Sequence, residues 1–250
     1  MADYDNRVIR GRSVADAGAI DAGLRAYMLR VYNYMLIGLT LTGLSAWTVA
    51  NVPEVQALFF QVNETTGRFG LSALGWVAFL APLGLVLLMS FGLQRMSLGT
   101  AQAVFWGYAA LNGVALAPVL LLYTGASVAQ AFFVTAATFG AMSLYGYTTK
   151  SNLTGWGSFL FMGLIGVIIA SVVNLFVQSS AMSFAISVIG VLVFTGLTAY
   201  DTQTIKELYV ASDDGTVAGR KAIFGALRLY LDFINLFLMI LRLLGVANRR

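Results

Sequence analysis

Long stretches without a charged residue alternate along the chain with short polar segments. Charge-free intervals cover residues 31–53, 69–94, 96–149 and 151–200, and a last apolar stretch covers about 222–247. A transmembrane helix needs about 20 mostly apolar residues to cross roughly 30 Å of hydrocarbon. The two longest intervals can therefore each hold two spans, with breaks near residues 124–127 and 178–180. The pattern predicts seven transmembrane helices.

The apolar intervals are continuous, without the period-two alternation that a transmembrane barrel requires. We therefore predict an all-α, polytopic membrane protein with a single membrane domain over residues 31–247. A polar, mobile N-terminal tail (1–30) precedes this domain and a short end (248–250) follows it. Six glycines inside the spans are expected to let neighbouring helix backbones approach closely: Gly107, Gly113, Gly140, Gly146, Gly163 and Gly166.

The composition supports this prediction and narrows the possible chemistry. Hydrophobic residues make up 59% of the chain and charged residues only 10%, whereas ordinary globular proteins carry about 25% charged residues. The chain has no cysteine and no histidine, which excludes disulfides, thiolate or imidazole metal sites and Ser-His catalysis. We expect no enzymatic activity, no cofactor and no nucleic-acid partner, and any pH response must come from carboxylates.

The distribution of Lys and Arg predicts the orientation. If the N-terminus is cytoplasmic, ten basic residues face the cytoplasm and three face the other side, which follows the positive-inside rule. The ten are Arg7, Arg10, Arg12, Arg25, Arg30, Arg95, Lys150, Lys206, Arg220 and Lys221, and the three are Arg68, Arg249 and Arg250. Seven spans then place the C-terminus outside. Because no organelle signal is evident, we expect a bacterial cytoplasmic (inner) membrane.

Charged residues inside spans are the main candidates for function. Each costs about 2.5–3.5 kcal/mol near the centre of a helix, so such residues are rare without a role. Asp201 lies in the sixth predicted span and Asp232 in the seventh, and two adjacent antiparallel helices would bring them to a similar depth on the cytoplasmic side. Two carboxylates close together in a medium of low dielectric constant share a proton and titrate as a pair. This arrangement could sense pH without histidine.

A purely structural interpretation stays open for these charges. Asp201 could pair with Arg95, at the end of the second span, while Asp232 pairs with Arg228, four residues earlier on the same helical face. Both pairs would then only hold helices in register. Arg242 lies near the end of the last span and can extend its charge into the polar interface.

Three asparagines are further candidate polar groups along a pathway. Asn112 precedes Pro118 in the third span, where a distorted helix could expose a backbone carbonyl to a cavity. Asn174 and Asn235 are expected to form hydrogen bonds between helices. For all three, a structural role is the alternative to a role in conduction.

Two aspartate motifs carry a resemblance to a known family. They are residues 196–206 (GLTAYDTQTIK) and 226–237 (ALRLYLDFINLF), with weaker matches at 112–119 (NGVALAPV), 173–176 (VNLF) and 241–245 (LRLLG). The chain resembles the Bax inhibitor-1 family, in its bacterial branch.

This resemblance implies seven helices, of which the last lies at the centre of the other six, and a pH-sensitive calcium leak. It implies that Asp201 and Asp232 form a hydrogen-bonded latch and that an arginine of the second helix, best matched by Arg95, pairs with Asp201 in the closed state. Arg228 departs from the family pattern and would neutralise Asp232.

Two functions compete at this point. The first is a pH-sensitive calcium leak in which Asp201 and Asp232 gate and line the path. Because calcium takes six to eight oxygen ligands, two aspartates bind it only weakly, as conduction requires. The second is a non-conducting modulator of a membrane protease or a stress response, with structural aspartates. A secondary transporter is disfavoured because no inverted repeat is visible, and an intramembrane protease because its partner motif is missing.

Overall fold

The computed structural model describes residues 2–62, 69–92 and 95–248 and is almost entirely helical in these ranges. The helices are α1 Ala2–Asn51, α2 Pro53–Phe59, α3 Ala73–Gly92, α4 Leu98–Leu122, α5 Gly125–Thr148, α6 Thr154–Val177, α7 Ser180–Glu207 and α8 Gly215–Leu244. Two short strands, β1 Phe60–Val62 and β2 Phe69–Leu71, form an antiparallel hairpin between α2 and α3.

The predicted spans and breaks are confirmed. Six helices, α3 to α8, are each long and apolar enough to cross a membrane, and α1 with the short α2 makes a seventh span bent by 100°. The bend follows from Pro53, which disfavours helical geometry in the residue before it and starts α2 as its first residue. The turns between α4 and α5 and between α6 and α7 lie where the polar residues interrupt the long apolar intervals.

Short polar side chains define where four of the helices begin. Ser97, Thr124 and Ser179 each accept a hydrogen bond from a backbone N–H in the first turn of α4, α5 and α7. Asp214 does the same for α8. Because the first N–H groups of a helix have no partner inside the helix, these caps stabilise the starts of the spans by about 1 kcal/mol each.

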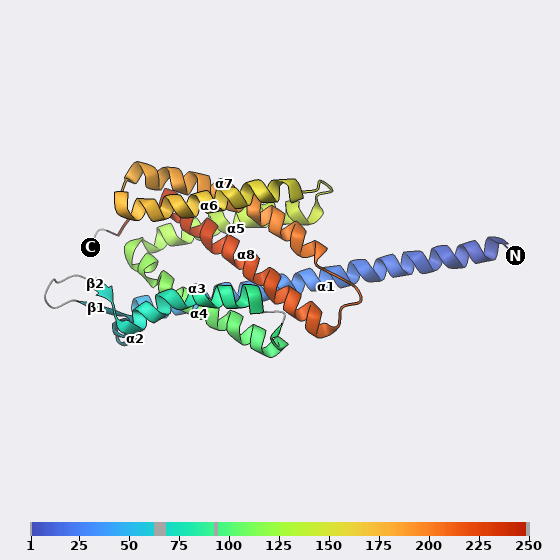
Figure 1. The fold of residues 1–250 in the computed structure, drawn as a ribbon, viewed down its shortest axis with the longest axis horizontal. Helices are drawn as coiled ribbons and strands as arrows, with labels where there is room; N and C mark the ends of the chain where they lie inside the picture. The colour runs from blue at the N-terminus through green and yellow to red at the C-terminus, as the bar shows by residue number, and fades with distance from the viewer. Residues whose placement is uncertain (1, 63–68, 93–94, 249–250) are drawn as a thin grey trace.

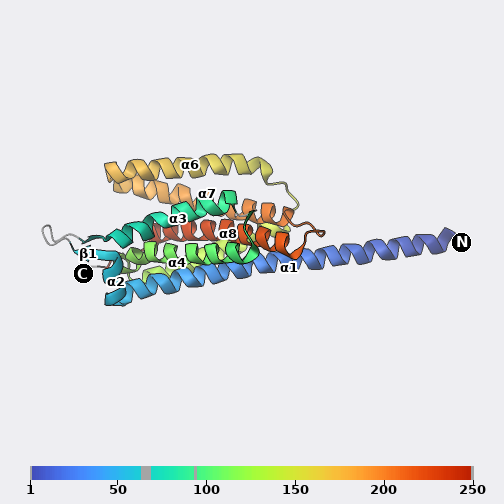
Figure 2. The same ribbon diagram turned by 60° about the horizontal axis from the view of Figure 1, so that its bottom comes forward.

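The last helix lies at the centre of the bundle (Figures 1 and 2). α8 packs against α1, α4, α5 and α7, and it is the most buried of the six helices α3 to α8, with 61% of its most apolar segment inside the protein. α3 packs mainly against α4, and α6 mainly against α7. The central position implied by the family resemblance is therefore confirmed, although α3 and α6 form an outer layer and make few contacts with α8.

Close helix packing depends on some of the expected glycines and not on others. A side chain at Gly113 would collide with the backbone of Thr42, and one at Gly146 with the backbone of Ala199, so these glycines let α4 approach α1 and α5 approach α7. By contrast, no neighbouring element lies within 4 Å of the Cβ position at Gly107, Gly140 and Gly166. For these three, the predicted packing role is wrong. The one other predicted glycine, Gly163, faces the side chain of Val193.

Two features differ from the sequence-based expectations. No strands were predicted between the first two spans, but a hairpin lies there, and residues 69–71 pair with β1 before the second span begins at Ala73. The N-terminal segment expected as a mobile tail is helical from Ala2 and continues into the first span, so that α1 projects well beyond the bundle (Figure 1).

Candidate functional site

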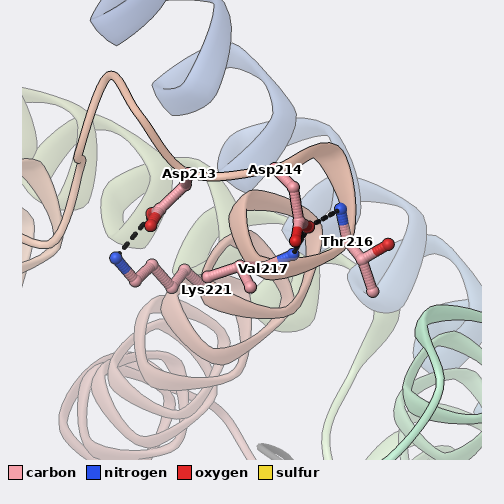
Figure 3. A network of polar contacts seen from close by, with 5 residues as sticks. All are labelled: Asp213, Asp214, Thr216, Val217 and Lys221. Atoms are coloured by element: carbon pink, nitrogen blue, oxygen red, sulfur yellow. Dashed lines mark hydrogen bonds and ion pairs between the residues drawn. The ribbon is translucent and has the colours of Figure 1, made fainter.

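The connection between α7 and α8 determines how the two aspartates meet. Asp214 accepts hydrogen bonds from the backbone N–H groups of Thr216 and Val217, both at 2.8 Å, and thereby starts α8. Asp213 forms an ion pair with Lys221, which lies two turns into α8, and Nζ of Lys221 is 2.5 Å from Oδ2 of Asp213 (Figure 3). These contacts fix the loop to the first two turns of α8. The helices α7 and α8 then run antiparallel and are in extensive contact with each other.

Asp201 of α7 and Asp232 of α8 face each other inside this pair, as predicted. Both residues are buried, with exposed fractions of 7% and 4%. Both carboxyl groups line the same cavity and are close enough to influence each other's charge. Oδ2 of Asp232 is buried and accepts no hydrogen bond from any donor that the described structure contains. Two carboxylates can hydrogen bond to each other only through a proton, so a shared proton would supply the missing donor.

Arg228 completes this group, but with a different partner from the one expected. Its Nη1 lies 3.5 Å from Oδ1 of Asp201 on the neighbouring helix, and not in an i to i+4 ion pair with Asp232. The guanidinium carbon also lies 5.6 Å from the centre of the Phe224 ring, one turn earlier on α8. Because the pair is long and the Arg228 side chain is 34% exposed, it is a weaker interaction than a bidentate pair.

The predicted role of Arg95 in this cluster is wrong. Arg95 lies in the connection between α3 and α4 and is exposed, and no ion pair of the described residues includes it. The physical reason is that α3 belongs to the outer layer and ends at Gly92. The connection that follows it meets α8 near the start of that helix, where Arg220 donates to the carbonyl of Met96, and the Arg95 side chain faces outward. The cation beside Asp201 comes from the central helix instead.

A cavity of about 540 Å³ borders the two aspartates. Its walls come from α6, α7 and α8, and the polar part of the lining consists of Ser158, Tyr200, Asp201, Arg228, Asp232 and Asn235. The carboxylates are therefore buried among helices and yet adjacent to a volume that water or an ion can enter.

Of the three asparagines, one lies at this cavity. Asn235 lines it, while its Nδ2 donates to the carbonyl of Leu231 in its own helix. Asn174 lies at the end of α6, where its Oδ1 accepts from the N–H of Ser179 in the turn to α7. The hydrogen bonds expected between helices are therefore wrong for both residues, because each side chain reaches a backbone group nearby.

Asn112 belongs to a second polar cluster, which the sequence analysis missed. Its Nδ2 donates to Oη of Tyr230 at 2.7 Å, and that hydroxyl is also 2.7 Å from Oγ1 of Thr42. Thr42 in turn lies within hydrogen-bonding distance of the carbonyl of Ala109. The cluster joins α1, α4 and α8 on the face of α8 opposite to Asp232. Tyr230 precedes Asp232 by two residues, which is about 200° around a helix. This spacing was the available sequence signal that Tyr230 lies on the opposite face of α8.

Comparison with known proteins places the chain in a family. The family described as "Inhibitor of apoptosis-promoting Bax1" matches residues 24–249. The chain belongs to the Bax inhibitor-1 family. It is 50% identical over 230 residues to the uncharacterized protein RP147 of Rickettsia prowazekii, and the match covers 92% of each chain.

Two further relatives in this family are membrane proteins by name. Inner membrane protein YbhL of Escherichia coli strain K12 is 48% identical over 231 residues, or 92% of this chain and 94% of YbhL. An uncharacterized membrane protein of Streptococcus pyogenes, SpyM3_0260, is 38% identical over 225 residues, or 90% of this chain and 94% of the relative. Together with the apolar helices, these matches identify this family member as a multi-pass membrane protein.

The carboxylate site of this family member offers few ligands for a metal ion. No group of three or more His, Cys, Asp or Glu side chains within the described ranges could hold a metal ion. Asp201 and Asp232 together offer at most four carboxylate oxygens, and Arg228 competes for one of them. A calcium ion there would keep much of its water shell. The arrangement therefore suits transient occupation by a cation and exchange of a proton.

Proposed function

We propose that this protein is a pH-sensitive cation leak, with calcium as the permeant ion, in which the Asp201–Asp232 pair is both the sensor and the gate. The observation that carries the proposal is the unpartnered, buried Oδ2 of Asp232 beside a second carboxyl group and a cavity of about 540 Å³. A structural pair would satisfy its oxygens, since buried polar atoms without a partner are costly. In a pair that binds and releases a proton, the proton itself supplies the donor that this oxygen lacks, and the oxygen loses its partner only when the proton leaves.

In the closed state, a shared proton joins the two carboxyl groups and Arg228 neutralises the remaining charge near Asp201. Loss of the proton leaves two like charges in a medium of low dielectric constant, which repel each other. The repulsion favours separation of α7 and α8 and admits a hydrated cation in place of the proton. Arg228, which already contacts Asp201 at one nitrogen only, competes with that cation as a tethered positive charge.

We place this gate on the cytoplasmic side of a bacterial inner membrane, with the N-terminus inside and the C-terminus outside. Lys and Arg residues concentrate at the end of the bundle where α7 meets α8, which supports this orientation. The name of the relative YbhL supports the inner membrane.

Calcium flux into liposomes that contain the purified protein tests the proposal. Fluorescence of an entrapped calcium indicator should rise at a rate that depends on external pH, and protein-free liposomes give the background. If the wild-type protein conducts no calcium at any pH between about 5 and 8, the range in which native proteins are usually most stable, the leak proposal is wrong.

A modulator without ion flux is the alternative, and one observation favours it. The N-terminal part of α1 extends far beyond the bundle as a helix (Figure 1), which is a shape suited to contact with another protein such as a membrane protease. Removal of this extension should then abolish the association with the partner without changing ion flux.

A further inference from the structure

A second cavity, with a lining that includes neither aspartate, lies between α1 and α5. Both helices pack against α8, but their backbones make little contact with each other, and a cavity of about 520 Å³ lies between their side chains. Its walls are almost entirely apolar and include Met28, Leu29, Phe139, Gly140 and Leu144. Because it lies between two outer surfaces of the bundle, it opens toward the lipid.

One end of this groove carries a positive charge. Arg25 lines the cavity, is exposed, and makes no ion pair or hydrogen bond with any residue that the structure describes. Tyr147 lines the same end, and its ring lies 5.8 Å from Nζ of Lys206. Arg25 stands six residues before the first apolar interval, or about 9 Å along a helix, which is the level of the lipid phosphates.

We infer that the α1–α5 groove is a binding site for an anionic phospholipid of the adjacent leaflet. Its phosphate binds Arg25, with Lys206 as a second positive charge nearby, and one acyl chain lies along the apolar walls. Charge complementarity selects an anionic headgroup, since basic side chains near a membrane surface attract acidic lipids by about 1 kcal/mol each. The groove carries a positive charge at one end and apolar side chains along its length. A phospholipid has the complementary arrangement, with a charged headgroup at one end of its acyl chains.

The shape of the groove depends on a glycine. Gly140 is exposed on α5, and no neighbouring element lies within 4 Å of the position that its Cβ would take. A larger side chain at this residue would therefore fill the space for the acyl chain without displacing a helix. Gly166 on α6 has the same open surroundings but lies outside this groove, so it offers a matched control.

Two hydrogen-bonded contacts connect the floor of the groove to α7. On its floor, Oη of Tyr32 lies 2.5 Å from Oγ of Ser143, and Ser143 lies 3.0 Å from Oγ1 of Thr202, the residue after Asp201. A bound lipid would therefore contact side chains that connect α1, α5 and α7. The binding site does not depend on the proposed leak, because lipid binding can be measured in the absence of ion flux.

Native mass spectrometry of the purified full-length protein tests the inference. Phosphatidylglycerol and phosphatidylcholine with identical acyl chains are titrated separately, and the occupancy of the first bound lipid is measured. We expect phosphatidylglycerol to bind several-fold more tightly. Arg25→Gln should weaken its binding about fivefold, which corresponds to about 1 kcal/mol for one basic residue. Arg30→Gln removes an exposed charge about 140° further around α1 and should have little effect.

Gly140→Leu should abolish tight binding of phosphatidylglycerol, while Gly166→Leu should retain it. Thermal unfolding in lipid-free detergent verifies that both leucine variants fold as the wild type does. Equal binding of phosphatidylglycerol and phosphatidylcholine would overturn the inference. Equal losses of phosphatidylglycerol binding in Arg25→Gln and Arg30→Gln would also overturn it, because they would indicate a general attraction of the lipid to the basic surface. Unchanged binding in Gly140→Leu, or cross-linking of two copies through α1 and α5, would also overturn it.

Discussion

Two polar clusters lie on opposite faces of the central helix, and they differ in how completely their hydrogen bonds are satisfied. On one face, Tyr230 joins Thr42 and Asn112 in a neutral cluster in which the hydroxyl of Tyr230 has two partners at 2.7 Å. On the other face, Asp232 has a buried oxygen without a partner among the described residues, and within the same part of the chain Asp201 has one long ion pair. The first cluster is saturated and the second is not.

This difference separates a structural cluster from a functional one in the same helix. Neutral groups with complete hydrogen bonds stabilise a single arrangement of three helices. Ionisable groups with an incomplete set of partners, next to a cavity of about 540 Å³, can change their protonation and their partners. The depth and the burial of the two clusters are similar, so neither property alone distinguishes them.

The largest effect is expected from removal of the ionisable groups. Asp201→Asn and Asp232→Asn should each abolish the pH dependence of calcium flux in liposomes, because an amide keeps the shape but cannot exchange a proton. Asp21→Asn, which changes an exposed aspartate of α1, is the control and should titrate as the wild type. Wild-type pH dependence in both variants of the pair would mean that the two clusters do not differ in function.

The second-largest effect is expected from removal of Arg228, the cation beside Asp201. Arg228→Ser should move the midpoint of the flux–pH curve to higher pH by about one unit, which corresponds to about 1.4 kcal/mol. The sign follows because a positive charge 3.5 Å from Asp201 favours the ionised carboxylate, so its removal lets the pair keep the shared proton at higher pH.

Arg95→Ser is the matched control for this variant, since it also removes one arginine. It should leave the midpoint unchanged, because Arg95 is exposed and lies outside the cluster. If Arg95→Ser shifts the midpoint and Arg228→Ser does not, the arginine implied by the family resemblance acts on Asp201 in a state other than the one described.

The contrast between these two arginines shows what the sequence could predict. The spans, their breaks and the meeting of Asp201 with Asp232 could be predicted, because charge-free length and the antiparallel order of adjacent spans constrain them directly. The partner of Asp201 could not, because it depends on which helices are central. Arg228 lies on the central α8, whereas Arg95 follows the outer α3.

The neutral cluster was missed for a related reason. Asn112 and Thr42 lie 70 residues apart and meet only through Tyr230, more than 100 residues further along the chain. Uncharged polar residues within spans carry little information in isolation, since they can bond to their own backbone, as Asn235 does. Only the packing of α1 and α4 against α8 selects these partners.

A smaller effect is expected in the neutral cluster. Tyr230→Phe removes the hydroxyl that Asn112 and Thr42 share, and it should lower the free energy of unfolding by about 1 kcal/mol, as hydrogen bonds between membrane helices do. Chemical unfolding in detergent measures the loss. The midpoint of the flux–pH curve should stay at the wild-type value, and a shift would show that the two faces of α8 are coupled.

The smallest effect separates the asparagines that border the carboxylate cavity from those that do not. Asn174→Ala removes the acceptor for the N–H of Ser179 in the α6–α7 turn, and it should cost at most about 1 kcal/mol of stability. Its rate of calcium flux should equal that of the wild type, because the turn lies at the end of the bundle away from the α7–α8 connection (Figure 1).

Asn235→Ala removes a polar group from the wall of the cavity itself and should lower the flux rate while leaving the pH midpoint in place. Measurement of both variants at saturating pH distinguishes the two outcomes. Equal flux rates in both would mean that a hydrated cation does not pass Asn235, so that only the carboxylates contact the ion.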